Sequence, residues 1–116
     1  MDYEKVLGIA LKTLDNKKAE DLSAVLIKDI TTLADVFVMA TATSTTHVRA
    51  LAAEVEEKLT EAGMPPHHIE GRASDWLLID CGSVVIHIFT RKSREFYGLD
   101  HMWSDGTALE VGKYLE

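Results

Sequence analysis

The residue types that could do chemistry gather in one stretch, WLLIDCGSVVIHIFT, which spans residues 76–90. Asp80, Cys81 and His87 interrupt two apolar runs there, on either side of a Gly-Ser pair. An aspartate and a histidine can act as acid and base, a cysteine beside a histidine can act as a nucleophile, and all three can bind metals. They can also belong to a surface that contacts a partner. The elements that position these side chains distinguish between the interpretations.

A Gly-Ser pair between two apolar runs predicts a β-hairpin whose two-residue turn has glycine in its first position. That turn fixes the register, and the register decides which side chains share a face of the sheet. One predicted face is wholly apolar and belongs to the core, whereas the other is mixed and carries both polar residues. The predicted pairs are Cys81 with Val84, Ile79 with Ile86 and Leu77 with Ile88 on the apolar face, and Trp76 with Phe89, Leu78 with His87 and Asp80 with Val85 on the mixed face.

This register argues against a nucleophilic site. It places Cys81 and His87 on opposite faces and leaves Ser83 in the turn itself. Asp80 and His87 are diagonal neighbours on the mixed face, roughly 7–8 Å apart at Cα, so a hydrogen bond could join them. With no nucleophile beside them, they form a satisfied half-buried pair and not a mechanism.

Metal and phosphate chemistry also lack their usual patterns. The five histidines form no H-x-x-x-H pair, adjacent His67 and His68 would point opposite ways, and one cysteine cannot build an ordinary zinc site. Nucleotidyl transfer needs closely spaced carboxylates after a Gly-Ser turn, and GSVVIHIF contains none. Neither G-x-x-x-x-G-K nor G-x-G-x-x-G occurs. We therefore expect no enzymatic activity, no metal and no other cofactor.

Large rings that carry a polar group favour a partner surface instead. Trp76, Tyr97 and Trp103 belong to residue types enriched at the energetic centres of interfaces. Further charge around them comes from Arg94, Asp100 and His101. The alternative interpretation places the three rings in the core. Because the segment REFYGLDHMW directly follows a strand with a mixed face, we favour a partner site for the cluster.

The first half of the chain predicts two helices and two strands. Apolar residues at helical spacing indicate helices over residues 2–16 and within 43–63. Ser44 or a neighbouring threonine suits the start of the second helix, and Gly63 suits its end. Short β-branched runs indicate strands at 24–30 and 35–41.

The second half predicts a loop with one short strand at 64–72, then the hairpin, then a short helix. Phe96, Leu99 and Trp103 share one stripe of that helix, and a turn follows at Asp105-Gly106. Together the elements predict an α/β fold, in which a single mixed sheet has helices packed on it.

Composition limits the class of partner. The 116 residues make one domain, and a net charge of −7 with few, scattered basic residues argues against direct nucleic-acid specificity. One cysteine indicates a reducing compartment. The N-terminus does not resemble a signal peptide, and no apolar stretch reaches the roughly 18 residues of a membrane span. We therefore expect a cytoplasmic protein that meets a small molecule, a neutral surface or a basic protein.

Four stretches resemble the ribosomal silencing factor family, also called Iojap-like proteins. They are PHHIEG, DWLLIDCGSVVIHIF, REFYGLDHMW and DITTLADVFVMATATSTTHVRALAAEVEEKL. The combination of W-x-L-x-D-x-G-x-V-V-x-H-x-F with R-x-[FY]-Y-x-L-[DE]-x-[LM]-W is long and specific, and the resemblance runs from the first helix to Trp103.

The resemblance implies a translational repressor. Family members bind the large ribosomal subunit through its ribosomal protein fourteen and sterically block joining of the small subunit. It also implies one domain over residues 1–116, with a nucleotidyltransferase-like sheet that lacks the catalytic carboxylates. A basic ribosomal protein would fit the acidic chain. The resemblance and the aromatic surface together give the expected partner-binding residues. They are Trp76, Asp80, His87, Arg94, Tyr97, Leu99, Asp100 and Trp103.

The chain departs from the family pattern at several positions. Val36 stands where the family usually has tyrosine, Thr41-Ala42 where it has Ser-Gly, Gly98 replaces a bulkier residue and Asp100 replaces glutamate. Because alanine resists positive φ, Ala42 puts the local turn in doubt. Two alternative functions stay open: a degenerate nucleotidyltransferase-like domain that binds a nucleotide, and a homodimeric scaffold that uses the same aromatic residues.

Overall fold

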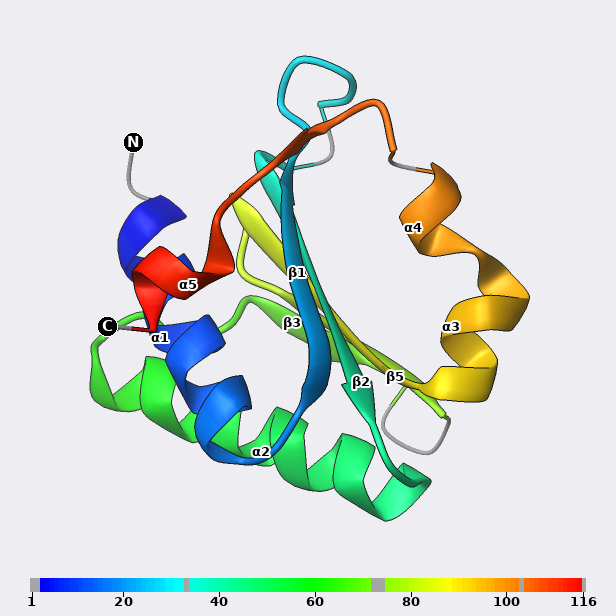
Figure 1. Ribbon diagram of the computed structural model, residues 1–116. Coiled ribbons are helices and arrows are strands. Elements are labelled where there is room, and N and C mark those ends of the chain that lie inside the picture. Colours follow the sequence, from blue (N-terminus) through cyan, green and yellow to red (C-terminus); the bar gives the residue numbers. More distant parts are fainter. Residues whose placement is uncertain (1–2, 33, 72–74, 103, 116) are drawn as a thin grey trace.

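A computed structural model of the protein describes residues 3–32, 34–71, 75–102 and 104–115, with only the backbone described at Leu99 and Met102. Helices are interspersed with single strands and runs of strands along the chain (Figure 1). Their bounds are α1 Tyr3–Asn16, β1 Glu20–Leu26, β2 Val36–Ala42, α2 Thr45–Glu61, β3 His68–Glu70, β4 Trp76–Asp80, β5 Val84–Thr90, α3 Arg91–Tyr97, α4 Leu99–Met102, β6 Thr107–Ala108 and α5 Val111–Tyr114.

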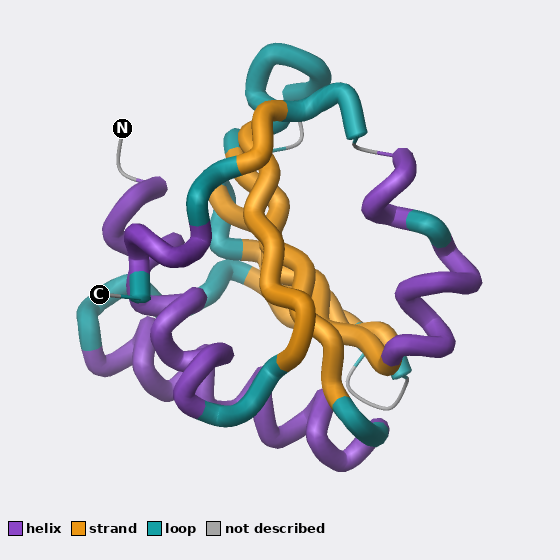
Figure 2. The backbone as a smooth tube through the Cα atoms, in the orientation of Figure 1, coloured by secondary structure: helices purple, strands orange, loops and turns teal. Residues whose placement is uncertain are grey.

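The strands form one six-stranded sheet in the order β3-β4-β5-β2-β1-β6. Strands β2 and β5 run parallel, and every other neighbouring pair is antiparallel. Figure 2 shows this sheet as a twisted layer with helices on both sides. The predicted α/β fold with a single mixed sheet is confirmed.

The hairpin has the predicted register. Strand β4 pairs with β5 from Trp76↔Phe89 to Asp80↔Val85, and the Cys81 N–H donates to the Val84 carbonyl at 2.9 Å. Gly82 supplies the positive φ of 82° that the tight turn needs. Each of the two faces of the hairpin therefore carries the residues that the spacing predicts.

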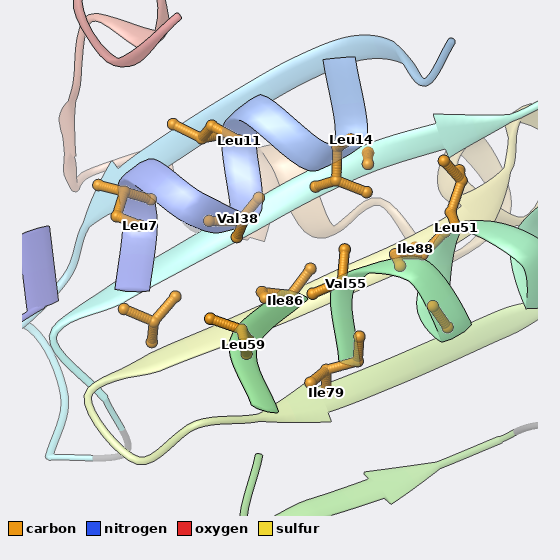
Figure 3. Close-up of a cluster of buried hydrophobic side chains, with 14 of the residues drawn as sticks. Leu7, Leu11, Leu14, Val38, Leu51, Val55, Leu59, Ile79, Ile86 and Ile88 are labelled. Carbon is orange, nitrogen blue, oxygen red and sulfur yellow. The ribbon is translucent and has the colours of Figure 1, made fainter. Parts of the chain in front are cut away.

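Helices α1 and α2 cover the apolar face and form the main core with it (Figure 3). Leu11 and Leu14 of α1 and Leu51 and Leu59 of α2 are fully buried there. Ser44 caps α2 by accepting the His47 N–H at 3.1 Å. The packed helices hold the sheet in place, and the sheet in turn positions the side chains on its other face.

One predicted strand bound is wrong, and the doubt about Ala42 is removed. The strand expected at 24–30 runs from Glu20 to Leu26, because the Ile30 and Thr31 N–H groups both donate to the Ile27 carbonyl and close a turn there. Ala42, whose lack of freedom at positive φ puts a local turn in doubt, lies in β2, paired with Thr90. Its backbone is not among those with positive φ, so alanine is tolerated.

The helix expected after Thr90 is interrupted. Gly98 adopts a left-handed conformation with φ 61° and donates its N–H to the Arg94 carbonyl, which ends α3 and starts α4 in a new direction. The prediction of one stripe is therefore wrong, and Phe96 is 79% exposed. Trp103 lies outside the described residues. The turn at Asp105-Gly106 and the short strand within 64–72 are both present.

Candidate docking site

We use outer face for the side of the sheet opposite α1 and α2, where α3 and α4 lie (Figure 1). Its centre is aromatic. His87 contacts Phe37 at 4.8 Å between ring centroids and Trp76 at 5.9 Å, and Trp76 contacts Tyr97 of α3 at 4.5 Å. Tyr97 in turn meets the edge of Phe96 at 5.0 Å. This aromatic row, Phe37–His87–Trp76–Tyr97–Phe96, leads from the buried sheet to the surface.

Exposure rises along the aromatic row. Phe37 and His87 are buried, Trp76 is half-buried, and Tyr97 is 47% exposed. Phe96, at its outer end, is one of the most exposed large apolar side chains in the described part of the chain. Exposed rings continuous with a buried cluster are typical of interfaces, because the buried part holds the exposed part in place.

His87 acts inside this row. Its Nδ1 accepts the indole N–H of Trp76 at 3.2 Å, so the neutral ring carries its proton on Nε2. Nε2 is buried and has no partner within the described residues. Burial lowers the pKa of His87 to about 4. At neutral pH His87 is therefore an uncharged group that orients Trp76.

Asp80 and His87 are not joined. The Oδ1 of Asp80 accepts the Gly82 N–H at 2.8 Å, whereas His87 is paired with Trp76. The hydrogen bond that the spacing allowed is therefore not formed, and that prediction is wrong. The carboxylate of Asp80 stabilises the hairpin turn because an aspartate readily bonds a backbone N–H two residues on.

Cys81 is a weak nucleophile in this setting. Burial, and then the charge of Asp80, raise the pKa of its thiol to about 11, so little thiolate exists at neutral pH. It lines a pocket of about 430 Å³ at the turn end of the hairpin, together with Met64 and His67. Among the residues that the structure describes, no three His, Cys, Asp or Glu side chains gather where they could hold a metal ion.

All the N–H donors of the Arg94 guanidinium make hydrogen bonds within the chain. Its Nε and Nη2 donate to the two carboxylate oxygens of Asp100 at 2.7 and 2.8 Å. Its Nη1 donates to the Asp21 carbonyl and to Thr41 Oγ1, and Nη2 also donates to Ser23 Oγ at 3.3 Å. A guanidinium has five N–H groups, and these contacts use every one. Arg94 thus ties α3 and α4 to β1 and β2.

A second arginine fastens the same helix. The Nη1 of Arg91 lies 2.7 Å from the Oδ2 of Asp21, and its Nη2 lies 3.1 Å from the Oε1 of Glu20. Asp21 has an unusual positive φ of 47°, at an irregularity in the pairing of β1 with β2 between Glu20 and Ser23. This distortion turns the Asp21 carbonyl and both carboxylates to the end of the sheet where α3 begins.

Two shallow pockets flank the contact between Trp76 and Tyr97. One, of about 220 Å³, is lined by Asp75, Lys92, Ser93, Phe96 and Tyr97. The other, of about 230 Å³, is lined by Glu70, Gly71, Trp76 and Leu78. Both are smaller than the roughly 300–1,000 Å³ of small-molecule sites, which suits single side chains of a partner better than a cofactor.

The structure places most of the expected partner-binding residues on or beside the outer face, with Asp80 at the turn end of the hairpin and Trp76 at the other end of β4. Trp76, Asp80 and His87 share the outer face, and Arg94, Tyr97 and Asp100 adjoin it from α3 and α4. Leu99 lies in α4, and nothing is described of its side chain. Phe96 is the residue that the sequence interpretation missed. Its place on one stripe with Leu99 and Trp103 assumes an unbroken helix, and the glycine at position 98 is the signal against that assumption.

Comparisons with known proteins show the family of the chain. The family model described as "Ribosomal silencing factor during starvation" matches residues 1–116. The ribosomal silencing factor of Halalkalibacterium halodurans is 34% identical over 112 residues, covering 96% of each chain. A mouse protein named "Mitochondrial assembly of ribosomal large subunit protein 1" is 30% identical over 84% of this chain and 45% of its own.

A solved structure is also similar. A crystal structure of a Chromobacterium violaceum protein superposes with a TM-score of 0.86 at 31% identity, covering 90% of this chain and 88% of that one. In the described part of the protein, no helix is both long and apolar enough to cross a membrane. With a family model that spans the whole chain and relatives that align almost end to end, the protein belongs to the ribosomal silencing factor family.

Proposed function

We propose that this protein is a translational repressor that docks on the large ribosomal subunit through ribosomal protein fourteen and sterically blocks joining of the small subunit. Residues 1–116 act as one docking domain on cytoplasmic ribosomes. Its family membership and the large-subunit name of the mouse relative support this proposal.

The observation that carries the proposal is the exposed end of the aromatic row. Phe96 and Tyr97 stand out from the surface, yet Tyr97 rests on Trp76, whose ring is hydrogen-bonded to buried His87. Such rings bind a partner at low entropic cost because they are already ordered. Exposed apolar side chains that contact one another, as these two rings do, are typical of interaction sites.

Charge supports a basic protein as the partner. The two pockets that flank Trp76 and Tyr97 are lined by the acids Glu70 and Asp75, which we call the acidic rim, and by one base, Lys92. An acidic rim around an apolar centre attracts a basic protein and repels the phosphates of RNA. We therefore assign the direct contact to the ribosomal protein and not to ribosomal RNA.

The structure suggests a division of roles among the proposed partner-binding residues. Trp76, Tyr97 and Asp100 expose atoms that a partner can reach, and Phe96 joins them. His87, Asp80 and Arg94 act from inside, because their polar atoms are buried or already engaged. Leu99 and Trp103 remain proposed contacts on the family resemblance alone.

Co-sedimentation tests this proposal. The protein should pellet with purified large subunits but not with small subunits, and purified ribosomal protein fourteen should compete for it. Binding to naked ribosomal RNA with no binding to ribosomal protein fourteen would contradict the partner assignment.

The two alternatives predict other results. A nucleotidyltransferase-like nucleotide-binding domain should be stabilised by ATP or CTP with Mg²⁺, by roughly 2.7 kcal/mol at a hundredfold excess over Kd. A homodimeric scaffold that uses the aromatic row should self-associate without large subunits and stay associated when they are added, as measured by light scattering. Neither alternative accounts for both the acidic rim and the family membership.

A further inference from the structure

The ion pair between Arg94 and Asp100 is asymmetric in its exposure to solvent. The Arg94 side chain is 11% exposed, whereas that of Asp100 is 49% exposed. Arg94 therefore lies in the interior, and Asp100 lies at the surface. The two residues have different parts to play, although both stand in the same segment.

Arg94 is immobilised from several directions. Besides its bonds to Asp100, it donates to the backbone of β1 at Asp21 and to the side chain of Thr41 in β2. Its guanidinium carbon also lies 5.5 Å from the ring centroid of Phe89, within the range of a cation–π contact. Because two strands and a ring hold the guanidinium, it can hold the carboxylate of Asp100 in one position.

Asp100 keeps free accepting capacity. A carboxylate offers about four acceptor positions, and the Arg94 fork takes one on each oxygen. The hydrogen bonds from Arg94 also keep the pKa of Asp100 below its ordinary value, so the group is an anion at neutral pH. The backbone N–H of Asp100 also bonds this carboxylate, and the half-exposed group keeps accepting capacity for a donor from outside.

We propose that Asp100 is the residue that receives a cationic or N–H donor group of the partner, and that Arg94 is a positioning residue that holds this carboxylate ready for it. The inference rests on the proposed function, because it takes the partner to be a basic protein. A carboxylate fixed in advance loses no side-chain freedom on binding, which a freely rotating aspartate would lose.

A double-mutant cycle on binding to purified ribosomal protein fourteen tests the inference. Asp100→Asn keeps the shape but removes the charge, and it should weaken binding by about tenfold or more. Arg94→Lys keeps the charge but loses the bidentate fork, and it should weaken binding by about threefold to tenfold. Because Arg94 acts through Asp100, adding Arg94→Lys to Asp100→Asn should bring no further loss beyond about twofold.

Two control variants make the cycle specific. Arg91→Lys changes the neighbouring arginine that fastens the same helix to Glu20 and Asp21, and it should leave binding unchanged. Asp100→Glu retains both the charge and a fork partner for Arg94, and it should bind within about threefold of the wild type. Should Arg94→Lys fail to fold, the contrast between Asp100→Asn and Asp100→Glu decides the matter.

The outcomes separate this inference from the proposed function. Additive losses in the cycle, or an Asp100→Asn variant that binds as well as the wild type, would overturn the inference while the proposed function stands. A wild-type protein that fails to bind ribosomal protein fourteen would overturn both. Coupled losses together with an unaffected Arg91→Lys variant would support the inference.

Discussion

The imidazole of His87 lies among the rings of Phe37, Trp76 and Phe89, where a positive charge would lose its hydration without gaining a partner. Its folded-state pKa of about 4 is below the ordinary value of 6.5, so the unfolded chain binds the proton more readily. Stability is therefore full above pH 6.5 and falls as the pH drops towards 4. The loss attributable to His87 amounts to about 3 kcal/mol.

A His87→Phe variant tests this pH dependence. It removes the titrating group but keeps a ring of similar size, so its stability should change much less between pH 6.5 and 4 than that of the wild type. Urea unfolding at several pH values measures the difference. Carboxylates elsewhere titrate equally in both proteins and cancel in the comparison. Parallel curves for the two proteins would show that His87 is not the group responsible.

Leu51 and Tyr97 separate folding from docking. Leu51 is fully buried between α2 and the sheet, so Leu51→Ala should cost about 2–5 kcal/mol of stability. Tyr97 is half-exposed and rests on one side of Trp76, so Tyr97→Ala should cost at most about 1.5 kcal/mol of stability.

Binding should show the reverse order. Tyr97→Ala should weaken large-subunit binding by about 2 kcal/mol or more, whereas folded Leu51→Ala protein should bind nearly normally. Thermal unfolding and co-sedimentation of each variant are measured together. If Tyr97→Ala unfolds the protein as Leu51→Ala does, the ring is core and the docking surface lies elsewhere.

The break between α3 and α4 depends on one residue. Gly98 has a φ of 61°, and a Cβ placed there would meet no atom within 4 Å, so the cost of Gly98→Ala comes from backbone strain alone. An alanine forced into that conformation costs roughly 1–2 kcal/mol. Relief of the strain would move α4 and with it Asp100, so we expect weaker binding as well as lower stability.

Gly63 provides the matched control. It ends α2 with a φ of 80° and equally open space around it, but it lies away from the aromatic row. Gly63→Ala should lose a similar amount of stability without a change in binding. Differential unfolding and large-subunit titration of both variants test this pair. Equal effects of the two substitutions on binding would refute a special role for the break at Gly98.

Features that neighbouring residues determine could be predicted from the sequence. The hairpin register follows from a Gly-Ser turn, and the caps of α2 follow from Ser44 and Gly63. The position of β1 could not be predicted, because its pairing with β2 decides it and not its own composition. The five bonds of Arg94 were also out of reach, since they join residues up to 73 positions apart. The sequence could therefore predict which residues share the outer face, but not the individual contacts that each of them makes.

The net charge of −7 acts over the whole molecule. An acidic protein approaching a basic partner is steered by long-range attraction, which dissolved ions screen. The association rate with large subunits should therefore fall by about tenfold or more between low and high salt, while the dissociation rate changes less. Stopped-flow mixing over a range of salt concentrations measures both. An association rate that does not depend on salt would contradict electrostatic steering of the protein to the large subunit.

The central claim is that the protein docks on the large subunit through the exposed end of the aromatic row and thereby blocks joining of the small subunit. Its most direct test is light scattering of purified large and small subunits as they join, with the protein added at increasing concentration. We expect joining to fall in proportion to the large subunits occupied by wild-type protein, and to be unaffected by a folded variant that carries Phe96→Ala and Tyr97→Ala. Full joining at saturating wild-type protein, or equal inhibition by the double variant, would contradict the account.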